Sequence, residues 1–220
     1  MTQLKMIASD SQLQEFLGMF RKGSTLTYKK GEYIIRPGES PNGVFYIEKG
    51  LVKAFNISKY GEENLLIVRT EHEVFPLIWA VTGQERDIIY QALAPTTVLR
   101  VDRKIFEDFL RENPAALHPM LDLITEQYRR HSERILNLEY RTVRERLISF
   151  LLTMSDRFGK QTKEGLLIEV PLRHQDIASS INASRETTSR ELAYLERKEL
   201  VSNSAFYITL KDIQPLRDYL

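Results

Sequence analysis

The segment 173–198 constrains the fold more than any other part of this chain, because its pattern specifies two short helices joined by a tight turn. The first helix places Ile177 and Ile181 on one face, and the small side chain of Ala178 lets a second helix approach closely. Asn182 follows, and asparagine tolerates the positive φ that such a turn requires. The segment therefore predicts a helix-turn-helix unit.

The second helix of this unit is expected to begin at a serine cap and to carry its charges in its first two turns. Ser184 is the expected cap, with its hydroxyl accepting a hydrogen bond from the backbone N–H near Thr187. The face expected to be buried consists of Thr188, Leu192 and Leu195. The opposite face presents Arg185, Glu186, Ser189 and Arg190.

These exposed side chains match the chemistry of DNA base edges. Arginine can bond guanine O6 and N7 bidentately, and glutamate can accept a hydrogen bond from cytosine N4. In a helix-turn-helix, the N-terminal residues of the second helix reach the bases. The alternative is an amphipathic helix with ordinary surface charges, but the serine cap and the wing-like strand expected at 205–210 favour DNA recognition. The low net charge of +1 does not oppose this, since one local face is sufficient.

Between Ser24 and Val101, short β-branched and aromatic runs alternate with turn-forming glycines and prolines. Regular spacing of this kind predicts a small antiparallel sandwich or barrel. A short helix-like apolar patch surrounds Trp79. The expected strands cover 33–35, 44–47, 51–57, 65–68 and 98–101.

The longest helix is expected from about residue 115 to residue 139. Its apolar residues recur in alternating steps of three and four, which is the spacing of a two-stranded helical seam. The alternative is a helix that packs on its own β domain. Arg129, Arg130, Glu133 and Arg134 lie off the seam and are expected to be solvated. The seam residues are Leu117, Leu121, Ile124, Tyr128, Ile135 and Leu138, with His131 also on this line.

The sequence thus predicts an α+β protein in three parts. An antiparallel β domain, which the family resemblance given below implies is a β-roll, covers 1–114 and includes a short helix within 4–20. The long helix at 115–139 is the expected dimerisation helix, and a winged helix-turn-helix covers 140–220. A hinge is expected at 138–142. A helix with Gly159 at its C-cap, a polar loop at 161–165 and a strand at 166–170 precede the helix-turn-helix.

Composition excludes several classes of chemistry. The sequence contains no cysteine, which excludes disulfides, thiolate zinc sites, cysteine-ligated iron–sulfur clusters and cysteine nucleophiles. The four histidines (72, 118, 131 and 174) lack ligand spacing, so neither haem nor another metal is expected. No catalytic Ser/His/Asp arrangement or phosphate loop occurs, so no enzyme is expected. The chain has no signal layout and no membrane-length apolar run, which indicates a cytoplasmic protein.

Several strings together resemble the CRP/FNR family of bacterial transcription regulators. They are Gly31-Glu32-Tyr33-Ile34, Pro37-Gly38-Glu39, Phe45-Tyr46-Ile47-Glu48-Lys49-Gly50 and Ser184-Arg185-Glu186-Thr187-x-x-Arg190. The resemblance covers nearly the whole chain. It implies a homodimer that binds double-stranded DNA at an inverted repeat with TGTGA-like half-sites, and RNA polymerase as a partner. The expected DNA-binding set also contains Ser184, Thr187, His174 and Gln175. The alternative from another class is a β-roll docking module whose C-terminal helices bind a protein.

The resemblance also locates an effector region. Anchored on Gly83-Gln84-Glu85-Arg86, the phosphate-binding arginine of cyclic-nucleotide binders would be Arg86. The family's Gly-Glu pair, however, falls on Phe75-Pro76, and its small hydroxyl residue falls on Asp87. We therefore expect either an effector other than cAMP, with the apolar 75–81 segment lining its pocket, or a plugged pocket and constitutive activity. The expected effector pocket consists of Phe75, Pro76, Trp79, Arg86, His131 and Ser132.

Overall fold

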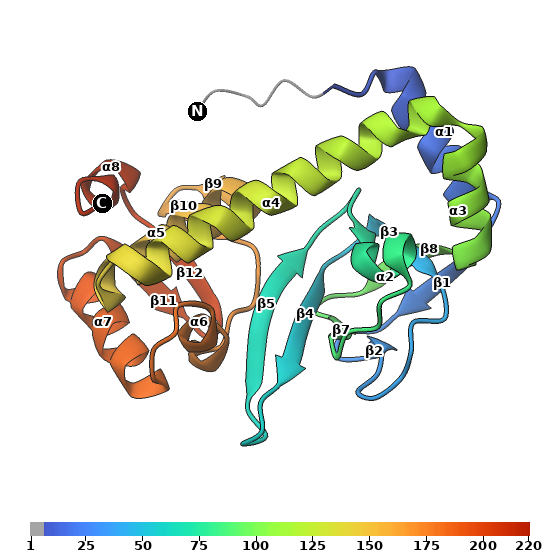
Figure 1. Cartoon of the computed structure of the whole chain (residues 1–220). Helices are drawn as coiled ribbons and strands as arrows, with labels where there is room; N and C mark the ends of the chain where they lie inside the picture. The colour runs from blue at the N-terminus through green and yellow to red at the C-terminus, as the bar shows by residue number, and fades with distance from the viewer. Residues whose placement is uncertain (1–6) are drawn as a thin grey trace. The chain divides into compact units, whose positions relative to one another are not determined.

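The computed structural model describes residues 7–220, and Figure 1 shows their elements in chain order. Internal contacts divide the chain into two compact units. The first contains the residues up to Ala54 together with Ile67–His131, and the second contains Phe55–Leu66 together with Ser132–Leu220. This grouping differs from the predicted three parts, because the long helix contributes residues to both units and Phe55–Leu66 groups with the C-terminal half.

The N-terminal half begins with helix α1 (Asp10–Arg21), where a short helix within 4–20 was expected. Residues 4–6 of that expected range lie outside the described part of the chain. Two four-stranded sheets follow, so the predicted β-roll is confirmed. One has the order β1-β8-β3-β6, with β1 (Ser24–Tyr28), β3 (Val44–Lys49), β6 (Val74–Phe75) and β8 (Thr96–Val101). The other has the order β2-β7-β4-β5, with β2 (Tyr33–Ile35), β4 (Val52–Ile57), β5 (Glu63–Arg69) and β7 (Ile89–Ala92).

Strand β3 shows how the sequence builds this half. Its first four residues are all buried, and successive side chains of a strand point to opposite faces. Val44 and Tyr46 therefore join the core cluster beneath α1, whereas Phe45 and Ile47 join the cluster inside the roll. The turn after β3 requires Gly50, because its φ is +103° and a Cβ there would lie 2.6 Å from the carbonyl oxygen of Pro95.

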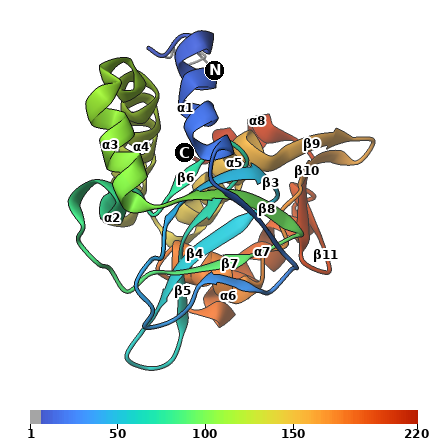
Figure 2. The same ribbon diagram turned by 90° about the vertical axis from the view of Figure 1, so that its right-hand side faces the viewer.

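Helices cover one end of this β-roll. Helix α2 (Leu77–Thr82) contains Trp79, as expected, and α3 (Arg103–Glu112) is followed by the short 3₁₀ helix η1 (Pro114–Ala116). Figure 2 shows α1 and α3 next to the beginning of the long helix α4 (Leu117–Tyr140). A cluster of rings with centroids 5.5–6.4 Å apart joins α1, α3 and strand β3, and it consists of Phe16, Phe20, Tyr46 and Phe106.

Helix α4 starts and ends close to the predicted residues, and most of the expected seam is exposed. Leu117, Leu121, Ile124, Tyr128 and Ile135 are each 45–73% exposed, while Leu138 is half-buried. The expectation that the off-seam arginines are solvated is wrong for two of them. Arg130 forms ion pairs with Glu73 and Glu126, and Arg134 donates to the carbonyl oxygen of Leu66.

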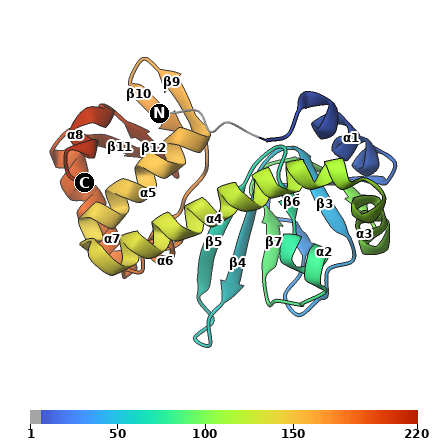
Figure 3. The ribbon, with the colours of Figure 1, turned by 45° about the horizontal axis from the view of Figure 1, so that its top comes forward.

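The second unit combines helices with a third sheet (Figure 3). Thr142 caps helix α5 (Val143–Phe158) through a capping box with Glu145, so the expected hinge falls at the link between α4 and α5. Gly159 is the C-cap, as expected, and a Cβ there would lie 2.2 Å from the carbonyl oxygen of Ser155. The sheet, in the order β11-β12-β10-β9, contains β9 (Gly159–Thr162), β10 (Gly165–Ile168), β11 (Val201–Ser204) and β12 (Tyr207–Leu210).

The prediction of a polar loop at 161–165 is wrong in part. Residues Gly159–Thr162 form strand β9, which pairs antiparallel with β10, so only the turn between these strands is loop. The segment is polar and mostly exposed, so its sequence gives no sign of a strand. Its hydrogen bonds to β10 stabilise it as one. Helices α6 (His174–Ser180), α7 (Arg185–Arg197) and α8 (Ile213–Arg217) complete the unit. Within residues 7–220, no helix has both the length and the apolar character to cross a bilayer.

Candidate nucleic-acid interface

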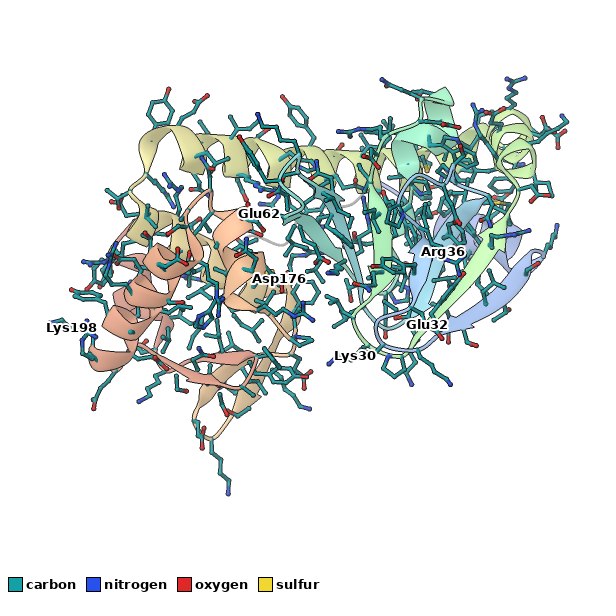
Figure 4. All side chains as sticks on the ribbon, turned by 90° about the horizontal axis from the view of Figure 1, so that it is seen from below. Lys30, Glu32, Arg36, Glu62, Asp176 and Lys198 are labelled. Atoms are coloured by element: carbon teal, nitrogen blue, oxygen red, sulfur yellow. The ribbon has the colours of Figure 1, made fainter. Side chains whose placement is uncertain are left out.

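Helices α6 and α7 form the predicted helix-turn-helix. Ile177, Ala178 and Ile181 are buried, as expected, and Asn182 has a φ of 49° in the turn. The backbone N–H of Arg173 donates to Asp176 Oδ2 over 2.9 Å, which satisfies one of the free donors at the start of α6. Figure 4 labels Asp176 on α6 and Lys198 just after the last residue of α7.

The cap of α7 follows the prediction. The backbone N–H of Thr187 donates to Ser184 Oγ over 3.1 Å. The buried face is the expected one, with Thr188, Leu192 and Leu195 each no more than 1% exposed. A capped helix whose apolar face is fully packed holds its opposite face in a fixed orientation, and this is the requirement for presenting side chains to a rigid partner.

That opposite face presents two guanidinium groups and a carboxylate. Arg185, Glu186 and Arg190 are exposed in the first two turns of α7. Arg190 Nη2 donates to Thr187 Oγ1 over 3.4 Å. Hydrogen bonds from its own backbone N–H and from the Ser184 hydroxyl lower the pKa of Glu186. The carboxylate is therefore ionised at neutral pH and can act as a hydrogen-bond acceptor.

Ser189 and His174, two further expected DNA-binding residues, bond to each other. Ser189 Oγ and His174 Nδ1 are 2.7 Å apart, and both residues are half-buried. On the other side of the ring, Asn203 Nδ2 lies 3.0 Å from His174 Nε2. Since the amide Nδ2 can only donate, His174 Nε2 accepts and Nδ1 carries the proton that is donated to Ser189. The pair thus joins the start of α6 and the second turn of α7 to strand β11, and its contact with DNA stays a prediction.

Other predicted residues lie near this pair. Gln175 follows His174 in the first turn of α6 and is half-buried, as is Thr187, while Ser184 is exposed. The wing is held in place by two backbone contacts: the N–H of Asn203 donates to Glu196 Oε1 over 2.9 Å, and the N–H of Leu172 donates to the carbonyl oxygen of Phe206 over 2.8 Å.

Two arginines on α5 that the sequence did not single out stabilise this interface. Arg146 donates to the carbonyl oxygens of Ile181 (2.7 Å) and Asn182 (3.2 Å) in the turn between α6 and α7. Arg144 pairs with Glu191 over 2.7 Å, and its guanidinium carbon lies 3.7 Å from the centroid of the Tyr194 ring. The sequence gives no signal for these roles, because the acceptors lie 35 or more positions away along the chain.

The structure places the six residues of the expected effector pocket in different environments. Phe75 is fully buried and stacks between Phe45 and Tyr90, with ring centroids 5.2 Å and 4.7 Å away. Pro76 is also buried, as the residue before α2. The guanidinium of Arg103 lies 5.6 Å from the centroid of the half-buried Trp79 ring. The remaining members are Arg86 and His131, both exposed, and Ser132, which is half-buried.

A cavity of about 510 Å³ does exist in the first unit, but in another place. Its walls come from α1, the turn between β5 and β6, and α4. All six residues of the expected effector pocket are described, and the walls of this cavity include none of them. Phe75 is packed in the core of the roll and does not line this cavity, and the two alternatives for the 75–81 segment stay predictions.

Comparisons with known proteins agree with the two halves seen here. Residues 25–113 match the cyclic nucleotide-binding domain, and residues 145–219 match the Crp-like helix-turn-helix domain. The chain is 32% identical over 178 residues to the global nitrogen regulator of Nostoc sp., covering 80% of each protein. The chain belongs to the CRP/FNR family. It is thus a transcription regulator with a helix-turn-helix DNA-binding domain.

Further relatives of this CRP/FNR-family chain extend the comparison. The global nitrogen regulator of Synechocystis sp. is 31% identical over 186 residues, which is 84% of this chain and 83% of that protein. A variant of CooA from Carboxydothermus hydrogenoformans has the same fold, with a TM-score of 0.76 at 22% identity over 96% of this chain and 97% of that one. Family membership favours the DNA-binding interpretation over the protein-docking alternative.

Proposed function

We propose that this CRP/FNR-family regulator acts in the cytoplasm as a homodimer that reads an inverted repeat with TGTGA-like half-sites. The observation that carries the proposal is the exposed, serine-capped start of α7, with Arg185, Glu186 and Arg190 on one face. The two arginines can read guanines, and the ionised Glu186 can accept from cytosine N4 on the complementary strand. RNA polymerase is the proposed partner of the DNA-bound dimer.

The exposed apolar residues of α4 support the dimer. An aqueous monomer that left Leu121, Ile124 and Tyr128 at 45–73% exposure would keep a continuous apolar stripe in water. Pairing the stripe with the same stripe of a second copy buries it, and the steps of three and four suit such a pair. A two-fold dimer also explains an inverted repeat, because each recognition helix then meets an identical half-site.

We further propose that the regulator responds to an effector other than cAMP or is active without one, and that it has no catalytic role and no cofactor. The residues present do not fit a cyclic nucleotide. Pro76 cannot supply the carboxylate that would bind the ribose, and the phenyl ring of Phe75 is packed between Phe45 and Tyr90 in the core of the roll. Asp87, beside Arg86, adds a negative charge where an anion would bind.

A competition assay tests the DNA specificity. The protein is titrated into a labelled inverted repeat, and binding is followed by fluorescence anisotropy. The half-site centres of this duplex are one helical turn apart, about 34–36 Å. A competitor with scrambled half-sites is expected to bind about a thousandfold more weakly, or weaker still, at physiological salt. Equal affinity for both duplexes would contradict the proposal.

A second duplex separates the dimer geometry from the base readout. Inserting about five base pairs between intact half-sites turns one half-site to the opposite side of the DNA. A dimer with two fixed recognition helices should then lose most of its affinity, whereas a protein that reads single half-sites should not change.

A further inference from the structure

We propose that the cavity between α1, the turn between β5 and β6, and α4 is the effector site. Its ligand is an uncharged, largely apolar small molecule that carries one hydrogen-bond acceptor. The inference rests on the proposed function in one respect, namely that the effector is not cAMP. It assigns that effector a place and a chemical class outside the region predicted around Phe75.

The size and lining of the cavity suit such a molecule. Its volume of about 510 Å³ lies within the usual range of small-molecule sites, about 300–1,000 Å³. Such sites combine an apolar wall with a few polar groups that orient the ligand. Here the apolar wall consists of Leu13, Phe16, Leu17, Pro119 and Leu123. The polar side chains include Tyr46, His72, Glu73, Asp122, Glu126, Gln127 and Arg130.

Polar contacts hold the walls together around the empty space. The backbone N–H groups of Ile7 and Ala8 donate to the carboxylate of Asp122 over 2.8–3.1 Å. Gln12 Nε2 and His118 Nδ1, 2.9 Å apart, form a second link between α1 and α4. Because these contacts fix the two helices at a distance, the cavity is preformed, and a ligand need not separate the helices to enter.

His72 is a second fixed part of the wall. Its φ of 69° lies in the left-handed region, which non-glycine residues adopt at a cost. Tyr46 Oη lies 2.6 Å from His72 Nδ1, so the imidazole is held in place by a residue of the central strand β3. The strained turn and the bonded ring together keep the β-roll side of the cavity in one conformation.

Gln127 supplies the group that would orient the ligand. Its Oε1 accepts a hydrogen bond from Arg69 Nη2 over 3.3 Å, which fixes the orientation of the amide. Its Nε2 is buried and has no hydrogen-bond partner among the described residues. A buried donor without a partner is destabilising. Gln127 lines the cavity, so a ligand carbonyl or hydroxyl oxygen that reaches this donor after a small movement of the side chain would gain a favourable bond. This donor predicts the single acceptor of the ligand.

The charges of the wall disfavour anionic ligands. Glu71, Glu73, Asp122 and Glu126 contribute four carboxylates to the lining. Three guanidinium groups pair with two of them: Arg69 and Arg130 with Glu73, and Arg129 and Arg130 with Glu126. Hydrogen bonds from Arg129, which has the larger effect, and from Arg130 lower the pKa of Glu126 to about 2, so this carboxylate is ionised at neutral pH. An added phosphate or carboxylate would meet an excess of negative charge in a partly buried space. The cavity therefore selects uncharged molecules.

The position on α4 explains how such a ligand could regulate DNA binding. The cavity takes Asp122, Leu123 and Gln127 from the same turns of the helix that expose Leu121 and Ile124 on the proposed seam. A ligand in the cavity therefore contacts one face of the helix turns whose other face pairs with the second copy. If the ligand binds more tightly to one position of α4 than to another, it stabilises the dimer conformation that contains that position.

Binding of prodan, an uncharged naphthalene dye with one ketone, tests the site. Prodan is titrated into the full-length protein without DNA, and its polarity-sensitive emission is followed. We expect saturable binding at one site per chain. Leu13→Trp, which places an indole at the cavity wall, should abolish this binding. Gln127→Glu keeps the acceptor for Arg69 but removes the donor, and should weaken binding about two- to tenfold.

Ile105→Trp is the matched control, because Ile105 is an exposed apolar residue on α3 that does not line the cavity. This variant should bind prodan like the unchanged protein. If the unchanged protein does not bind prodan saturably, or if Leu13→Trp and Ile105→Trp bind it equally well, the proposal is wrong. Failure of the proposed DNA specificity is recognised separately, as equal affinity for specific and scrambled duplexes in a protein that still binds prodan.

Discussion

Arg185 and Arg190 are the residues on which selective DNA binding should depend. Replacing either by alanine removes a bidentate guanine contact and should cost about 1–3 kcal/mol of binding free energy on the specific duplex. Binding to the scrambled duplex should change much less. Anisotropy titrations with both duplexes measure the two effects. Arg111→Ala, at an exposed position on α3, is the control and should leave both affinities unchanged. An unchanged ratio of affinities in both α7 variants would argue against base contacts by these side chains.

Glu126 gives the first unit a pH-dependent contribution to stability. Its two arginine neighbours lower its folded-state pKa to about 2, below the ordinary value of 4.5. A lowered folded-state pKa means that the contribution is complete above about pH 4.5 and is lost as the pH falls towards 2. Glu126→Gln should therefore lower the melting temperature at pH 7, and the difference from the unchanged protein should shrink as the pH approaches 3. Thermal unfolding followed by circular dichroism measures it, and a difference independent of pH would contradict the ion-pair explanation.

Among the structural elements, the turn between α6 and α7 depends on a residue outside it. Arg146 donates to the carbonyl oxygens of Ile181, Asn182 and Arg141 over 2.7–3.2 Å. Arg146→Met keeps much of the apolar side chain but removes these charge-assisted bonds, and should destabilise the unit by about 1.5–3 kcal/mol. Denaturant unfolding provides the measurement. Lys163→Met, in the exposed turn between β9 and β10, should be neutral, and equal effects of the two substitutions would exclude this role for Arg146.

Elements with a strong local pattern could be predicted from the sequence, whereas elements that depend on distant partners could not. The pattern of helix α7 is local, since Ser184 caps its own helix and Thr188, Leu192 and Leu195 repeat at helical spacing. The short strands β6 and β7 and the polar strand β9 have little pattern of their own and exist because they pair with neighbours.

The same distinction applies to the site. The sequence identifies which side chains lie on the exposed face of α7, because helical spacing determines the face. It does not show that Ser189 bonds to His174, that Asn203 completes the contact, or that Arg130 is paired with Glu73, because each of these contacts joins separate elements. The cavity was missed for the same reason. Its walls come from α1, the β5–β6 turn and α4, whereas the resemblance directed attention to Phe75.

For the whole molecule, α4 is the element through which the two units can be coupled. Its residues up to His131 belong to the unit that contains the cavity, and those from Ser132 belong to the unit that contains α7. The helix ends at Tyr140, and Thr142 caps the next helix, so the direction of the chain changes within two residues. In the proposed dimer, a shift of α4 would reach α7 through this short link.

The proposed seam makes a prediction for the assembly as a whole. Leu121→Asp or Ile124→Asp places a carboxylate in the middle of a stripe that is exposed in the single chain and buried in the dimer. Two like charges would face each other across the two-fold axis without solvent, so the dimer should dissociate. The folded single chain should be nearly unaffected, because both side chains are 45–49% exposed there. Sedimentation measures the oligomeric state, and circular dichroism confirms that each chain remains folded.

The DNA-binding result follows from the same geometry. A dimer with two linked recognition helices gains binding free energy from both half-sites of an inverted repeat, whereas a monomer gains the binding free energy of one half-site. The seam variants should therefore lose tight binding to the inverted repeat but keep weak binding to a single half-site. Ile105→Asp introduces the same charge at an exposed apolar residue outside the seam and should keep both the dimer and tight binding. If Leu121→Asp and Ile124→Asp remain dimeric, α4 does not form the interface, and the stripe must have another partner.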